Sequence, residues 1–135
     1  MIPINLPKIG EEEIEAVVKV MRTGILTSGL GAGPMVTQFE KNFAKFAGSE
    51  HAIAVNTGTA ALHAAVMAAG VKFGDEVILP SFTFVATAEA VVLAGGTPVF
   101  TDIDPDTYNL SPKAIVKNVT KKTKAILPVD LYGLS

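Results

Sequence analysis

From residue 51 onward, short apolar runs alternate with longer runs of helical pattern. The apolar runs predict strands at residues 52–55, 76–79, 98–101 and 125–129. The longer runs predict helices at residues 60–69, 84–93 and 112–119. Strands that alternate with helices of this length pair in parallel, because each helix carries the chain back across the sheet. We therefore expect an α/β fold, a mainly parallel sheet with helices on both faces.

Two amphipathic helices are predicted before this alternation, at residues 10–21 and 36–46. Gly24 is expected to end the first of them, since glycine readily takes the left-handed conformation. The second carries three aromatic side chains that we expect to point into a core: Phe39, Phe43 and Phe46. The chain thus divides into a helical segment at 1–50 and strand–helix repeats at 51–135.

Composition narrows the class of protein. The 135 residues fit one domain, of which 49% are hydrophobic and 18% charged. This apolar balance favours strands buried on both faces, or a piece whose missing partner covers much of its surface. Eleven basic and thirteen acidic residues give a net charge of −2, which offers no basis for a nucleic-acid partner. With no cysteine, no membrane-spanning stretch and no secretory signal, we expect a cytoplasmic protein without a metal site.

A polar turn at Asn56-Thr57-Gly58-Thr59 separates the first predicted strand from an alanine-rich helix. Such a turn directs unpaired backbone N–H groups and the positive end of the helix dipole at one point, which suits a phosphate. Gly58 allows close approach, and the hydroxyls of Thr57 and Thr59 can donate hydrogen bonds. An ordinary turn with a threonine cap explains the same residues equally well.

The loop after the second predicted strand places two aromatic residues, Phe82 and Phe84, beside this turn. Ligands of open parallel sheets bind outside the carboxyl ends of the strands, where both loops are expected. One of the two rings is therefore a candidate to stack on a flat ligand. We expect at least one of them to be a core residue.

Eight motifs, in matching order and spacing, resemble the N-terminal part of the DegT/DnrJ/EryC1/StrS family of sugar aminotransferases. They are 9–14 (IGEEEI), 24–29 (GILTSG), 39–40 (FE), 56–62 (NTGTAAL), 74–78 (GDEVI), 80–87 (PSFTFVAT), 98–104 (PVFTDID) and 128–133 (PVDLYG). The resemblance implies the large domain of an aspartate-aminotransferase-like transferase that uses pyridoxal 5'-phosphate. This chain would cover only the N-terminal part of that domain, and the small C-terminal domain would be absent.

The resemblance also implies roles for single residues. Gly58 and Thr59 match the family's phosphate-binding turn, and Phe84 matches the aromatic residue that stacks on the pyridine ring. Thr27, with Ser28 and Gly29, lies in a loop that in the family is near the active site, so Thr27 is a candidate substrate-binding residue. Two features depart from the family: three extra residues at 30–32, and Asp130 where relatives often have histidine.

No catalytic residue is assigned within this chain. In the family, the lysine that forms a Schiff base with the cofactor and the aspartate at the pyridine nitrogen come later in the chain, beyond Ser135. The first strand of the family's sheet also pairs with strands from later in the chain, so the strand at 52–55 is expected to lack its neighbours here. We therefore expect a truncated, split or partial member of the family.

The function implied is amination of a keto sugar, nucleotide-linked, with glutamate as a typical amino donor, in amino-sugar or polysaccharide biosynthesis. Family members are usually homodimers, which implies a homodimer here. Two alternatives are a non-catalytic binding or regulatory relative on the same scaffold and a pyridoxal-phosphate-dependent sugar dehydratase. A generic nucleotide-binding domain would explain the phosphate turn but not the other seven motifs.

Overall fold

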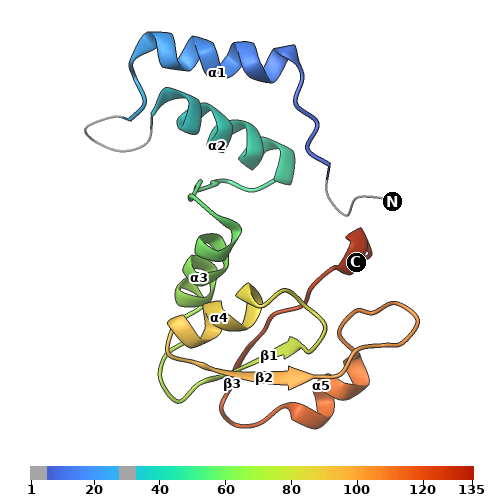
Figure 1. Cartoon of the computed structure of the whole chain (residues 1–135). Helices are drawn as coiled ribbons and strands as arrows, with labels where there is room; N and C mark the ends of the chain where they lie inside the picture. Colours follow the sequence, from blue (N-terminus) through green and yellow to red (C-terminus); the bar gives the residue numbers. More distant parts are fainter. Residues whose placement is uncertain (1–5, 28–32) are drawn as a thin grey trace. The chain divides into compact units, whose positions relative to one another are not determined.

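The computed structural model describes residues 6–27 and 33–135 and separates the chain into two compact units, Met1–Ala54 and Val55–Ser135. The first unit contains helices α1 (Glu11–Thr23) and α2 (Pro34–Ala47) (Figure 1). The second contains α3 (Gly58–Ala68), β1 (Glu76–Pro80), α4 (Ala86–Leu93), β2 (Thr97–Thr101), α5 (Pro112–Asn118), β3 (Thr123–Ile126) and the short helix η1 (Leu131–Gly133). None of the helices within the described residues has the length and apolar character needed to cross a membrane.

Helix α1 begins and ends as its sequence predicts. The Glu13 carboxylate accepts the Gly10 N–H at 2.7 Å, which satisfies a donor at the first turn. Gly24 has φ 67° and donates its N–H to the Met21 carbonyl, so the left-handed glycine ends the helix. The helix has no buried residue. Apart from the half-buried Val20, its apolar side chains are exposed.

Helix α2 has the expected position, but its aromatic side chains do not enter a core. Phe39, Phe43 and Phe46 are all exposed, and the expectation that they are buried was wrong. They recur at helical spacing on one face, and their rings contact one another with centroid distances of 5.7 and 6.3 Å. Among the described residues of this unit, nothing covers that face.

The strand predicted at 52–55 is not formed. These residues have no ladder partner in the described structure, and Ile53 is 84% exposed. The Ala54 N–H instead donates to the Glu40 carboxylate of α2 at 2.9 Å. A strand needs a neighbour to bond with, and none of the three sheet strands in the described structure pairs with these residues.

The sheet is parallel, with strand order β2-β1-β3. The chain leaves β1 in one direction to form β2, then crosses back over β1 to form β3. Because such crossovers are right-handed, α4 and α5 lie on opposite faces of the sheet (Figure 1). This confirms the predicted α/β fold.

The central strand supplies the core. Val77, Ile78 and Leu79 are fully buried, as expected when helices cover both faces. Val77 and Leu79 pack on one face with residues of α3, α4 and the loop after α3: Val66, Val71, Ala90 and Val91. On the other face, Asn118 joins α5 to the sheet: its side-chain amide donates to the Thr101 hydroxyl of β2 at 3.1 Å.

Most element boundaries differ from the predicted ones by one to three residues, and two of the differences have a clear cause or consequence. Strand β3 ends at Ile126 and not at residue 129, because the Leu127 N–H makes the last bond to β1 and Pro128 has no N–H to continue it. Helix α4 begins at Ala86 and not at residue 84, so Phe84 belongs to the loop. This second difference changes how the Phe84 ring is held.

Leu79→Ala should lower the free energy of unfolding of the intact protein by about 2–5 kcal/mol, because it removes a fully buried side chain from a packed cluster. Denaturant titration followed by circular dichroism measures this loss. Phe73→Ala is the matched control: Phe73 is 94% exposed, so its loss should stay within about 0.5 kcal/mol. Equal losses in the two variants would contradict the core described here.

Candidate functional site

The first wall of the candidate site is the N-terminus of α3. Thr57 is its N-cap: its hydroxyl oxygen accepts the Ala60 N–H at 3.0 Å, and its carbonyl accepts the Ala61 N–H at 3.0 Å. The N–H groups of Gly58 and Thr59 have no acceptor among the described residues. The threonine cap and the anion-binding turn are therefore compatible, because the cap uses other donors.

Gly58 is not required by the fold. A Cβ built on Gly58 meets no atom within 4 Å, and its backbone does not have the positive φ that favours glycine. A side chain there would enter open space. The small residue thus leaves room for a ligand and relieves no internal clash.

The second wall is the loop between β1 and α4. Its Phe84 is 76% exposed and lines an open hollow of about 660 Å³ together with Gly58 and Thr59. Four small or aliphatic residues complete the lining: Ala61, Leu62, Ala65 and Ala86. Three residues predicted from two separate segments therefore border one hollow.

The chemistry of this hollow is that of an anion site beside an apolar platform. No ionisable side chain of the described residues lines it, and the first turn of α3 carries no acidic residue to oppose the positive end of the helix dipole. The exposed aromatic ring and the aliphatic wall can receive a flat, weakly polar ring. The arrangement suits a ligand that combines a phosphate group with an aromatic ring.

Among the described residues, neither a lysine nor a cluster of metal ligands adds to this set. All ten lysines of the chain are exposed, and none of them lines the hollow. Within residues 6–27 and 33–135, no group of three acidic or histidine side chains is placed to hold a metal ion.

Neither aromatic residue of the β1–α4 loop is a core residue, so the expectation that at least one is buried was wrong. Phe82 is 47% exposed and packs against Tyr108, with the ring centroids 5.9 Å apart. Tyr108 lies in the loop after β2 and has φ 61°, an unusual backbone conformation for a residue other than glycine. This aromatic pair joins the loops that follow β1 and β2.

Asp104 shapes the loop that holds Tyr108. Its carboxylate accepts the N–H groups of Thr107 and Asp106 at 3.1 and 3.0 Å, and these bonds lower the pKa of Asp104. The Asp104 carbonyl accepts the Tyr108 N–H at 2.8 Å. The turn is thus best held at pH values where Asp104 is ionised.

Asn109 joins the loop after β2 to the end of the chain. Its amide nitrogen donates to the Leu134 carbonyl at 2.8 Å, and its amide oxygen accepts the Leu131 N–H at 3.0 Å. Sequence reasoning missed this residue, because no local pattern relates partners 22 and 25 positions apart. Asp130, just before η1, is exposed.

Thr27 belongs to the first unit and is exposed. Ser28 and Gly29, grouped with it in the sequence, lie outside the described residues, as do the extra residues 30–32. The role of Thr27 in substrate binding stays a prediction.

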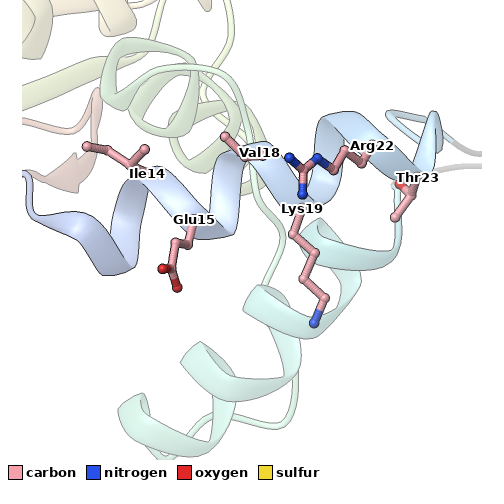
Figure 2. A pocket seen from close by; sticks show the side chains of 6 residues that line it. All are labelled: Ile14, Glu15, Val18, Lys19, Arg22 and Thr23. Atoms are coloured by element: carbon pink, nitrogen blue, oxygen red, sulfur yellow. The ribbon is translucent and has the colours of Figure 1, made fainter.

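A second hollow lies on α1, and Figure 2 shows the six side chains that line it. All six come from this one helix: Ile14, Glu15, Val18, Lys19, Arg22 and Thr23. A hollow lined by a single helix is an uncovered helix face. It lacks the converging polar groups of a binding site.

Comparison with known proteins gives consistent matches over nearly the whole chain. The chain is 47% identical to the spore coat polysaccharide biosynthesis protein SpsC of Bacillus subtilis (strain 168), over 99% of this chain and 33% of that protein. It is 44% identical to GDP-perosamine synthase of Caulobacter vibrioides, over 98% of this chain and 35% of that protein. The chain therefore spans about a third of the length of these relatives.

Solved structures share the fold. NtdA from Bacillus subtilis, whose crystal structure contains the bound cofactor PMP, superposes with a TM-score of 0.83 at 40% sequence identity. That match covers 91% of this chain and 27% of the NtdA chain. The model of the DegT/DnrJ/EryC1/StrS aminotransferase family matches residues 7–135. The chain belongs to the DegT/DnrJ/EryC1/StrS aminotransferase family.

Proposed function

We propose that this chain forms part of a pyridoxal-phosphate-dependent aminotransferase that acts on a nucleotide-linked keto sugar, with glutamate as the amino donor. The observation that carries the proposal is the shared hollow of Gly58, Thr59 and Phe84. The relatives named for polysaccharide biosynthesis and perosamine synthesis support a sugar substrate, and the PMP in NtdA supports the cofactor. A homodimer is proposed from the family alone.

The residues of the hollow fit the cofactor. The free N–H groups of Gly58 and Thr59, at the positive end of α3, would hold its phosphate, and the space in front of Gly58 allows the approach. The Phe84 ring would lie against its pyridine ring. When bound, pyridoxal phosphate supplies an electron sink for the carbon that gains or loses the amino group.

Both walls of the hollow, the α3 terminus and the Phe84 loop, would orient the bound cofactor. The α3 terminus anchors one end of the cofactor without a positively charged side chain, because backbone donors and the helix dipole already favour an anion. Phe84 restricts tilting of the ring, and the aliphatic wall formed by Ala61, Leu62 and Ala65 excludes water from that side. These residues bind and orient the cofactor, and we assign none of them a proton-transfer role.

Phe84→Ala should weaken binding of pyridoxal phosphate to the intact protein by about 1–2 kcal/mol, roughly 5- to 30-fold in Kd, through lost stacking and burial. Titration followed by cofactor absorbance or fluorescence measures the change. Phe82→Ala is the matched control, since Phe82 is on the same loop but does not line the hollow. Similar losses for both variants, or none for Phe84→Ala, would contradict the assignment.

Gly58→Ala should separate binding from stability. The methyl group would occupy open space at the turn that carries the free N–H groups, so we expect the affinity for the cofactor to fall by about 1.5 kcal/mol or more. The melting temperature without cofactor should be unchanged or higher, since alanine favours a helix over glycine. Wild-type affinity in this variant would mean that the phosphate binds elsewhere.

Borohydride reduction of the protein with bound cofactor, followed by peptide mapping, tests the role of the lysines. Because all ten lysines of this chain are exposed and outside the hollow, we expect none of them to carry a site-specific pyridoxyl group. A single specific label on one of the ten would overturn that expectation. Cofactor binding without any specific label would favour the non-catalytic or dehydratase alternative.

A further inference from the structure

The first turn of α4 contains a buried hydroxyl group. Thr87 is only 5% exposed, and its hydroxyl oxygen lies 2.8 Å from that of Thr83 in the preceding loop, at hydrogen-bonding distance. Thr83 is itself half-buried. A buried hydroxyl without a partner is costly, so this pair has a strong energetic reason to stay formed.

Thr87 also holds Phe84 through the backbone. Its N–H donates to the Phe84 carbonyl at 3.0 Å. Thr87 therefore makes two bonds across this short segment: its hydroxyl pairs with Thr83 just before Phe84, and its N–H binds Phe84 itself. The other end of the loop is held as well, because the Ser81 N–H donates to the Thr101 carbonyl of β2 at 3.1 Å.

The ring of Phe84 has little else to fix its direction. With 76% of the residue exposed, the packing of neighbouring side chains restrains the ring only weakly. The backbone sets the direction of its Cα–Cβ bond, and the two bonds of Thr87 hold that backbone. Neither Thr83 nor Thr87 lines the hollow, so any effect of theirs on a ligand there acts through Phe84.

We propose that Thr83 and Thr87 form a positioning pair that sets the orientation of the Phe84 ring toward the cofactor, a role that rests on the function proposed above. Ring stacking depends on the angle and offset of the two rings, so a small rotation of the loop lowers the contact energy. The pair binds nothing itself. It holds the loop that carries the exposed ring in its binding conformation, and so reduces the conformational entropy lost when the ligand binds.

A double-mutant cycle on the intact protein tests this role by measuring the Kd of pyridoxal phosphate for four proteins. Thr87→Val should weaken binding about three- to tenfold in the wild-type background, as expected for coupled residues. In the Phe84→Ala background it should have no further effect, because there is no ring left to orient. Equal weakening in both backgrounds would show a general structural effect and overturn the proposal.

Further variants separate positioning from folding. Thr87→Ser keeps both the hydroxyl and the N–H, so it should restore wild-type affinity. The pair Thr83→Val with Thr87→Val removes both polar groups, so it should recover the stability that either single change loses, but not the affinity. Full recovery of affinity in this double variant would overturn the proposal.

The visible circular dichroism of the cofactor at saturation supplies a readout besides affinity. It should change with Thr87→Val and stay unchanged with Thr87→Ser, because the signal depends on how the bound ring is held. A wild-type protein that does not bind pyridoxal phosphate would overturn both the proposed function and this inference. A protein in which Phe84→Ala weakens binding and Thr87→Val does not would overturn the inference alone.

Discussion

The central strand β1 bonds to β2 on one side and to β3 on the other, and the second unit depends on this parallel pairing. Its three apolar residues Val77, Ile78 and Leu79 are fully buried, which requires helices on both faces. Parallel pairing also brings the carboxyl ends of the three strands to one edge. The loops that carry Phe84, Tyr108 and η1 all begin there, so the core and the functional edge have the same cause.

Features of the fold and the site that depend on residues close in sequence could be predicted, and features that depend on contacts between distant residues could not. The turn before α3 follows from local pattern, and Phe84 borders the same hollow as Gly58 because α3 packs against α4. The turn and the place of Phe84 beside it were both predicted. Residues 52–55 have the composition of a strand, yet strand formation needs a neighbour that composition cannot supply. The two side-chain hydrogen bonds of Asn109 and the contact of Phe82 with Tyr108 join loops distant in sequence, so no local pattern predicts them.

The two units differ in how their helices are stabilised. In the second unit, α3 and α4 pack against the buried strand and share its core. In the first, α1 has no buried residue and α2 buries only Ala44, although both helices are amphipathic. Helices of 13 and 14 residues are marginally stable alone in water, so their apolar faces need a covering surface that the described residues of this unit do not provide. The wrong expectation for Phe39, Phe43 and Phe46 has this origin: the spacing identified the face correctly, but not what covers it.

The two walls of the hollow are built to different degrees. The wall at α3 is made by helix geometry, since the free N–H groups of Gly58 and Thr59 point outward whatever their side chains do. The wall at Phe84 is an exposed ring on a loop, and its direction needs a separate restraint. Thr87 can supply that restraint because α4 begins two residues later than the sequence pattern predicts, which leaves Phe84 in the loop between the paired hydroxyls. With the predicted boundary, Phe84 would belong to the helix and its ring would be held by helix packing. With the observed boundary, two residues later, Phe84 lies in a loop that is held by one hydroxyl pair and the backbone bond beside it.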